Sequence, residues 1–102
     1  RVGESIVLAR LARLYFRRNQ SGDEEKAREH LERALAISRS REHHRATIDY
    51  LRTYGEILQN LGKTQGACAS WKEAISLQKA LRIGPDEQEW FLNKMRSASC
   101  EV

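Results

Sequence analysis

The sequence predicts an all-α fold of about five antiparallel helices, and three observations lead to this prediction. The chain has 102 residues, of which 40% are hydrophobic and 31% are charged, and it contains a single proline. This composition is typical of amphipathic helices. Apolar residues recur at steps of three and four along most of the chain, which is the period of a helix with one buried face. Short polar junctions separate these segments, and three of the four contain glycine. The length is that of one domain.

The first helix is expected to end near Arg18 and the second to run to about Ser40. One face of the first helix would carry its packing residues, which are Leu8, Leu11, Ala12 and Tyr15. Residues at such spacing stack on the same side of a helix. Between the two helices, Ser21 precedes Glu24 by three positions, which is the pattern of a capping box. The second helix would therefore begin just after Ser21.

Three further helices are expected between residues 44 and 99. Gly62 would end the third helix near Leu61, because glycine readily adopts the backbone conformation that follows a helix. Thr64 is a candidate N-cap for the fourth helix. Gly84-Pro85 would stop that helix. The fifth helix would then begin with carboxylates, which favour a helix N-terminus, and its apolar residues are Trp90, Phe91 and Met95.

The second and fourth helices share a pattern at an offset of 40 residues. The matching pairs are Gly22 with Gly62, Ala27 with Ala67, Leu31 with Trp71, and Ala34 with Ala74. Self-similarity at a fixed interval is the signature of a helical repeat array. Small residues allow two helices to approach closely, and a large residue one turn later fills the space beside them. We expect Trp71, and with it Trp90, to pack in the core.

These positions resemble the tetratricopeptide repeat (TPR) family. Repeat one would comprise Leu8, Leu11, Ala12, Tyr15, Gly22, Ala27, Leu31 and Ala34, and repeat two Leu51, Tyr54, Gly55, Leu58, Gly62, Ala67, Trp71 and Ala74. The resemblance implies a right-handed solenoid fragment of helical hairpins that forms one domain over residues 1–102. Repeat one would span about 5–41, repeat two about 44–83, and a capping helix about 86–99.

Two features depart from the usual TPR pattern. The period is longer than the family's roughly 34 residues, and Arg39 and Lys79 stand where a proline is expected after the second helix of each repeat. Both differences agree with the 40-residue variants of the repeat, whose second helices are longer. Other repeats built from helical hairpins remain an alternative.

No pattern in the sequence indicates an enzyme, a cofactor or a metal site. His43 and His44 are adjacent, so on a helix they would point about 100° apart and could not share a metal ion. Gly62-Lys63-Thr64 is similar to the end of a phosphate-binding loop, but Ile57 stands where that loop needs its first glycine. We therefore expect a protein that is not an enzyme and that binds no cofactor and no metal.

The net charge of +4 is concentrated at the start of the chain. Residues 1–18 contain five arginines and one glutamate, a difference of +4, while residues 19–102 are balanced. Ile6, Arg10, Arg13 and Arg17 lie within about 60° of one another on a helical wheel. A stripe of this kind is most simply a solvated face.

The TPR resemblance gives that stripe a second interpretation. In TPR arrays the first helix of each repeat lines a concave groove that holds a partner. The partner-binding residues implied here are Arg10, Arg13, Phe16, Arg17, Arg52, Glu56, Gln59 and Asn60. Because guanidinium groups bind carboxylates and phosphates, the implied ligand is an acidic peptide or an acidic segment of a partner protein.

The function that the sequence predicts is therefore that of a protein-interaction module or scaffold. One alternative is a basic edge that contacts nucleic acid, and it is weakened by the balanced charge of residues 19–102. Another is a structural or self-associating part of a longer solenoid, which would form homo-oligomers through the ends of the array. The chain begins with Arg1, and we expect it to be a piece of a longer protein.

The cysteine content and the hydropathy predict the cellular setting. Cys68 and Cys100 lack the short spacings of zinc ligands, and two thiols make a poor disulfide framework. We expect free thiols in a reducing cytoplasmic or nuclear compartment. No apolar run reaches the roughly 18 residues that a membrane span needs, so no membrane contact is expected.

Overall fold

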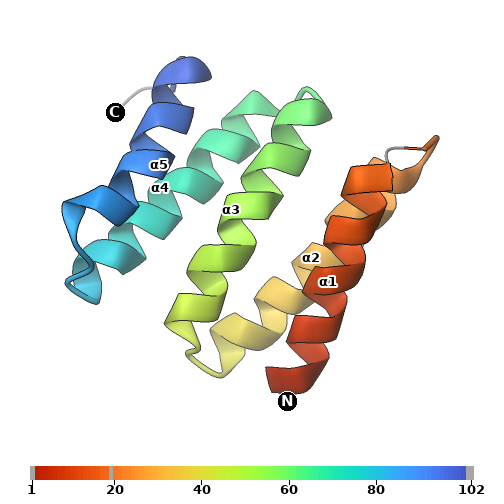
Figure 1. Cartoon of the computed structure of the whole chain (residues 1–102), viewed down its shortest axis with the longest axis horizontal. Coiled ribbons are helices and arrows are strands. Elements are labelled where there is room, and N and C mark those ends of the chain that lie inside the picture. The colour runs from red at the N-terminus through yellow and green to blue at the C-terminus, as the bar shows by residue number, and fades with distance from the viewer. Residues whose placement is uncertain (1, 19, 101–102) are drawn as a thin grey trace.

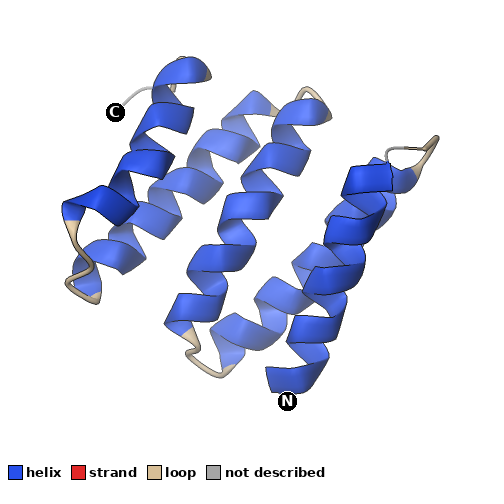
Figure 2. Cartoon of the chain, viewed as in Figure 1, coloured by secondary structure: helices blue, strands red, loops and turns tan. Residues whose placement is uncertain are grey.

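The computed structural model describes residues 2–18 and 20–100, and this part of the chain forms five α-helices and no strand (Figures 1 and 2). The helices are α1 (Val2–Arg18), α2 (Asp23–Ser40), α3 (His44–Asn60), α4 (Thr64–Ala80) and α5 (Pro85–Ser97). The predicted all-α fold is confirmed.

The helices are arranged as antiparallel neighbours in two layers. Figure 1 shows α1, α3 and α5 in one layer, with α2 and α4 behind them. α1 packs on α2 and α3 packs on α4, so the chain forms two helical hairpins, and α2 also packs on α3 while α4 packs on α5. The molecule measures 35 × 32 × 19 Å. One broad face is therefore built by α1, α3 and α5, and we call it the front face.

The small residues of the 40-residue pattern lie at the centres of the hairpins. Ala27 and Ala34 of α2, and Ala67 and Ala74 of α4, are all fully buried. Trp71 is also fully buried, as expected. Its indole lies against Gly55 of α3 so closely that a Cβ atom on residue 55 would be 2.6 Å from Trp71 Cε2. The glycine thus provides the space that the tryptophan fills.

One residue predicted for the packed face of α1 lies outside it. Leu8 and Ala12 are buried, but Leu11 is 37% exposed. The reason is the crossing of the helices: α2 and α3 cover the side of α1 that carries Ser5, Leu8, Ala9 and Ala12. Leu11 lies at the margin of that side, where no helix of the described chain covers it.

Two of the predicted helix caps are wrong. Gly22 precedes α2 with a positive φ of 82°, and the N-cap makes no side-chain hydrogen bond, so the Ser21 and Glu24 capping box does not form. Asp23 instead orders the turn before the helix, because its carboxylate accepts a hydrogen bond of 3.0 Å from the backbone N–H of Gln20. At α4, Thr64 is the first helical residue and Lys63 is the N-cap, again without a side-chain hydrogen bond.

The prediction that Gly62 ends the third helix is confirmed. α3 stops at Asn60, Leu61 is its C-cap, and Gly62 has a φ of 78°. This left-handed backbone conformation suits glycine. It lets the N–H of Lys63 bond to the carbonyl of Leu58 at 2.8 Å, which closes the helix end.

The two cysteines are paired, so the expectation of free thiols is wrong. Cys68 of α4 and Cys100, which follows α5, form a disulfide with their Cα atoms 5.7 Å apart. They are 32 positions apart in the sequence, and only the packing of α5 on α4 brings them together. The bond ties the end of the chain described here to the second hairpin.

Among the helices described, none is both long and apolar enough to cross a membrane.

Candidate functional site

The front face has a hollow of about 360 Å³ between α1 and α3. Its charged wall is formed by Arg10 and Arg13 of α1 with Arg45 and Asp49 of α3. The remaining lining residues are Ile6, Ala9, Ala46 and Tyr50. The packed side of α1 turns its small residues inward, which leaves the arginines of the neighbouring side at the rim. We call this space the α1–α3 hollow.

A buried contact beside this hollow holds the two helices together. Ser5 Oγ of α1 and Tyr50 Oη of α3 lie 3.1 Å apart, and both residues are buried. A contact between two buried hydroxyls favours the helix spacing at which it forms. The position of the arginines relative to Arg45 and Asp49 is therefore set by packed structure rather than by the arginine side chains themselves.

The arginines of the α1–α3 hollow are not used for internal ion pairs. Arg10, Arg13 and Arg45 are all exposed, and within residues 2–18 and 20–100 no salt bridge includes any of them. Three guanidinium groups thus share a space with one carboxylate, that of Asp49. Such a site can bind carboxylates in the two-pronged geometry that guanidinium provides.

A second hollow, of about 230 Å³, lies between α3 and α5. The net charge of its lining is negative, unlike that of the α1–α3 hollow, because the lining contains three carboxylates and one arginine: Asp49, Asp86, Glu87 and Arg52. The Arg52 guanidinium carbon stands 4.2 Å from the centre of the Trp90 ring. Arg52 is thus already engaged in a cation–π contact. Because Asp49 lines both hollows, the two are neighbours on the front face.

Gln78 of α4 closes the inner side of the second hollow. It is 2% exposed, and its Nε2 donates to the carbonyl oxygen of Glu87 at 3.2 Å. Since a carbonyl can only accept, this bond also fixes which end of the amide is nitrogen. The Oε1 atom has no hydrogen-bond partner in the described structure. The second hollow therefore combines carboxylates with a buried acceptor and suits a hydrogen-bond donor or a cation.

The other predicted partner-binding residues are spread along the front face. Gln59 lines a third hollow, of about 300 Å³, with Trp90 and three more residues of α5. Glu56 is occupied, because it lies 3.6 Å from Nζ of Lys94. Asn60 is exposed at the last position of α3. Trp90 itself is half-buried rather than a core residue.

Two residues of α1 do not join these hollows. Phe16 is half-buried and packs against the core. Arg17 is exposed and lines none of the three hollows described above. The structure therefore unites Arg10 with Arg13 but separates both from Arg52, which lies in the second hollow. The continuous row of arginines expected from the sequence is divided into two sites of different charge.

Sequence reasoning missed Arg45 as a member of the site. Arg45 precedes Asp49 by four positions and Arg52 by seven, which is the spacing of one helix face. The periodicity of α3 could therefore have found it. Arg45 escapes notice in the sequence because it falls in the first turn of the helix, directly after the polar junction at residues 41–43.

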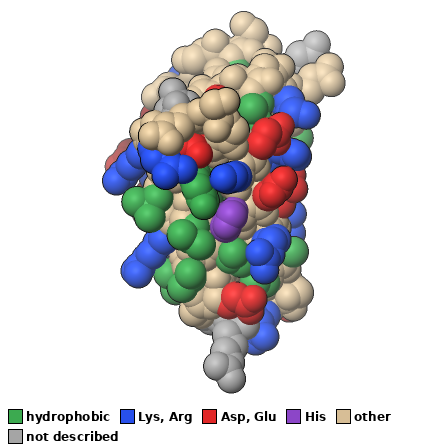
Figure 3. Space-filling view, turned by 90° about the vertical axis from the view of Figure 1, so that its right-hand side faces the viewer, with side chains coloured by type: hydrophobic (Ala, Val, Ile, Leu, Met, Phe, Trp, Pro, Cys, Tyr) green, Lys and Arg blue, Asp and Glu red, His purple; other side chains and the backbone are tan. Residues whose placement is uncertain are grey.

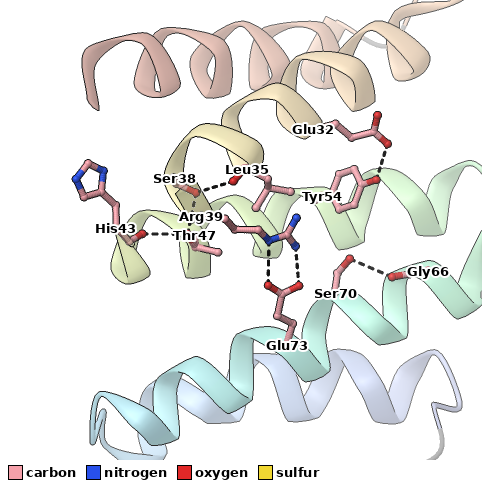
Figure 4. Close-up of polar contacts among 10 residues, drawn as sticks. All are labelled: Glu32, Leu35, Ser38, Arg39, His43, Thr47, Tyr54, Gly66, Ser70 and Glu73. Carbon is pink, nitrogen blue, oxygen red and sulfur yellow. Dashed lines mark hydrogen bonds and ion pairs between the residues drawn. The ribbon is translucent and has the colours of Figure 1, made fainter. Parts of the chain in front are cut away.

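Polar contacts also join the two hairpins to each other (Figure 4). The guanidinium of Arg39 donates to both carboxylate oxygens of Glu73, at 2.6 and 3.1 Å, and so joins α2 to α4. Tyr54 Oη donates to Glu32 at 2.6 Å, which joins α3 to α2. Burial, with this hydrogen bond, raises the pKa of Tyr54 to about 12. These contacts join the first hairpin to both helices of the second.

No group of three or more histidine, cysteine, aspartate or glutamate side chains within the described ranges is placed to hold a metal ion. His30, the third histidine, packs its ring 5.5 Å from that of Tyr15, and its Nδ1 lies 2.7 Å from the carbonyl oxygen of Lys26.

Comparison with known proteins adds no relative: no protein-family model matches the chain, and neither the curated proteins nor the solved structures include a match. The TPR resemblance stays a prediction from the residues quoted above.

Proposed function

We propose that this chain is a TPR-type protein-interaction module whose front face holds an acidic segment of a partner protein or peptide. The observation that carries the proposal is the α1–α3 hollow, where Arg10, Arg13 and Arg45 come together without internal ion pairs among the described residues. In this proposal the chain has no catalytic role and needs no cofactor.

The two hollows imply an orientation for the bound segment. Carboxylates of the ligand would lie over the α1–α3 hollow, where guanidinium groups are in excess. The second hollow would repel them, because Asp49, Asp86 and Glu87 line it, and would take a backbone N–H or a basic side chain instead. Gln59, further along α3, can bond an extended peptide backbone. A segment with acidic residues followed or preceded by a basic one fits this face.

Charge reversal in the first hollow tests the proposal. Replacing Arg10 and Arg13 by glutamate changes the net charge by 2 × (−2) = −4, and both side chains are exposed, so the fold should be unaffected. A fluorescent peptide rich in aspartate and glutamate should bind the native chain. It should bind the double variant about tenfold more weakly, because each exposed guanidinium–carboxylate pair contributes roughly 0.2–1 kcal/mol and the two new carboxylates repel the peptide.

A matched control separates the site from net charge. Arg33 of α2 and Lys72 of α4 are exposed on the other layer, and their double replacement by glutamate gives the same change of −4. If the control variant loses peptide binding as much as the Arg10 and Arg13 variant does, general charge and not the hollow explains the binding. A pull-down from cell extract with the native chain, the Arg10 and Arg13 variant and the control variant identifies the natural partner that depends on the hollow.

Contact with nucleic acid is the second candidate function, and the arginines of α1 are the observation in its favour. Affinity that comes from phosphate contacts falls steeply as salt rises. Filter binding of DNA and RNA across a salt series distinguishes the two functions. Nucleic-acid binding that exceeds peptide binding at physiological salt would reject the peptide proposal.

A cytoplasmic or nuclear location remains part of the proposal, and the disulfide between Cys68 and Cys100 weighs against it. Structural disulfides persist mainly in oxidising compartments. Alkylation of thiols immediately after cell lysis, followed by mass spectrometry, measures the state of the pair. Two alkylated cysteines support the proposed location, and a bonded pair contradicts it.

A further inference from the structure

An exposed apolar stripe runs along α1 on the side away from the core. Its centre is formed by Val7, Leu11 and Leu14, which are 55%, 37% and 62% exposed. Figure 3 looks onto this end of the molecule and shows hydrophobic side chains gathered among charged ones. Glu4 and Arg18 continue the stripe at its two ends, so the five residues are spaced by three and four positions in alternation. We call these five residues the α1 stripe.

The equivalent stripe on α3 is a helix-docking surface. The first helices of the two repeats align Leu8 with Leu51, an offset of 43 residues, whereas the second helices are related by 40. Each residue of the α1 stripe therefore corresponds to the α3 residue 43 positions later. The equivalents are Thr47, Tyr50, Tyr54, Ile57 and Leu61. Tyr50 and Ile57 are buried, at 5% and 0% exposure.

Three of these α3 residues make hydrogen bonds to the preceding hairpin. Thr47 Oγ1 lies 2.7 Å from Ser38 Oγ of α2. Tyr50 contacts Ser5 of α1 and Tyr54 contacts Glu32 of α2, as described above. On α3, this face is covered by α1 and α2. On α1, no helix of the described chain covers the equivalent face.

The order of residues makes the α1 stripe complementary to itself. If two α1 helices pair antiparallel about a two-fold axis at Leu11, Val7 of each copy meets Leu14 of the other. At the ends, Glu4 of each copy meets Arg18 of the other. Apolar residues at alternating steps of three and four form the seam of paired helices. A surface that pairs with its own copy must be self-complementary in this way.

Arg18 is held in place for such a contact. Its Nε and Nη2 donate to the carboxylate of Asp23 at 2.8 and 2.9 Å, while half of its side chain, 51%, is exposed. A guanidinium that is already oriented loses less conformational freedom when it binds a second carboxylate. Glu4, by contrast, is exposed and forms no salt bridge within the described residues.

We propose that a second copy of this chain covers the α1 stripe and forms a symmetric dimer through an antiparallel pair of α1 helices. A further helical hairpin, docked as α1 and α2 dock on α3, would also bury the apolar centre. On α3, where such a hairpin docks, the equivalent end positions are the uncharged Thr47 and Leu61. The opposite charges of Glu4 and Arg18 instead fit the pairing of two copies. Around α1, Arg13 lies about 140° and Arg10 about 80° from the centre of the stripe, so Arg13 and the α3 wall of the α1–α3 hollow stay open in the dimer.

Analytical ultracentrifugation of the whole chain tests the dimer. The buried patch is one helix face per copy, which is small, so association should be weak and should be measured up to about 1 mM protein. The mass should rise from 11.8 kDa toward twice that value. Leu14→Glu and Glu4→Lys should each abolish the rise. A matched control is Leu81→Glu, since Leu81 is 36% exposed and lies at the end of α4; it should dimerise like the native chain.

Cysteine crosslinking tests the antiparallel register. Val7→Cys and Leu14→Cys chains, mixed and mildly oxidised, should form a covalent dimer, whereas either variant alone and the native chain should form far less. Crosslinking of each variant with itself would indicate parallel helices and overturn the proposal. A mass that stays at 11.8 kDa at every concentration, or dimers that survive Leu14→Glu, would overturn it as well. A neutral change at the centre of the stripe, Leu11→Ser, should likewise abolish the dimer and leave peptide binding unchanged, so this proposal and the proposed function can fail separately.

Discussion

The contact between Gly55 and Trp71 gives the strongest prediction about stability. Gly55 lies within α3 and Trp71 faces it from α4. In Gly55→Ala, the added Cβ would stand 2.6 Å from Trp71 Cε2 and 2.9 Å from Cδ1. Carbon atoms in contact prefer roughly 3.5–4.0 Å. Either the indole or the backbone must move, and Trp71 is fully buried, so it has no free direction in which to move.

The expected cost follows from two opposing effects. Overpacking of a well-packed core costs about 1–3 kcal/mol, and a clash with a buried ring belongs at the upper end, about 3 kcal/mol. Alanine in place of glycine inside a helix stabilises by about 1 kcal/mol. The net loss is about 2 kcal/mol, which for a domain of this size lowers the midpoint of thermal unfolding by about 10 °C.

Thermal unfolding followed by circular dichroism measures this loss, and Gly3→Ala is the matched control. Gly3 also lies in a helix, but a Cβ there would have no neighbouring atom within 4 Å. Gly3→Ala should therefore leave the midpoint unchanged or raise it slightly. The difference between the two variants isolates the contact with Trp71 from helix propensity.

The double variant Gly55→Ala/Trp71→Phe completes the test. Phenylalanine lacks the part of the indole that approaches residue 55 most closely, so Gly55→Ala should cost less in a chain that already carries Trp71→Phe than in the native chain. If Gly55→Ala melts like Gly3→Ala, or if its cost is the same in both backgrounds, the packing of α3 on α4 described above is wrong.

Two further predictions concern charge and covalent linkage. The hydrogen bond from Arg18 lowers the pKa of Asp23 from 3.8 to about 2. Asp23 therefore stabilises the fold above about pH 4, and this contribution shrinks as pH falls and is lost below about pH 2. Asp23→Asn should melt earlier than the native chain at pH 6, and the gap between the two midpoints should narrow steadily toward pH 2. Parallel melting curves across this range would refute the ion pair. The disulfide closes a loop between residues 32 positions apart. In thermal or urea unfolding, Cys100→Ser should therefore lower the free energy of unfolding by about 3–4 kcal/mol. A reducing agent should destabilise the native chain by the same amount but leave the variant unchanged.

The repeat pattern shows how far sequence reasoning reaches for the fold. Ala27 and Ala67 are expected at the packed centres of two hairpins, and both are fully buried. Gly62 is expected to end a helix, and it does. These predictions depend on residues close together in the chain, whose spacing places them on one helix face or at one helix end.

The candidate site was only partly predictable for the same reason. The arginines of α1 could be assigned to one face from their spacing, but whether Arg52 joins them depends on the angle between α1 and α3. In the structure Arg52 turns to Trp90, a residue 38 positions later, while Arg45 takes its place beside Arg10 and Arg13.

The sequence by itself determined the number of helices, their ends to within a few residues, and the small residues at which the hairpins close. These follow from local periodicity and turn chemistry. Tertiary structure alone decided the pairing of Cys68 with Cys100, the contact of Gly55 with Trp71, and the exposure of the α1 stripe beside the burial of its equivalent on α3. The physical reason is that amphipathic helices can pack in several ways, and the crossing of helices distant in the chain selects which apolar faces meet and which charges remain free to bind.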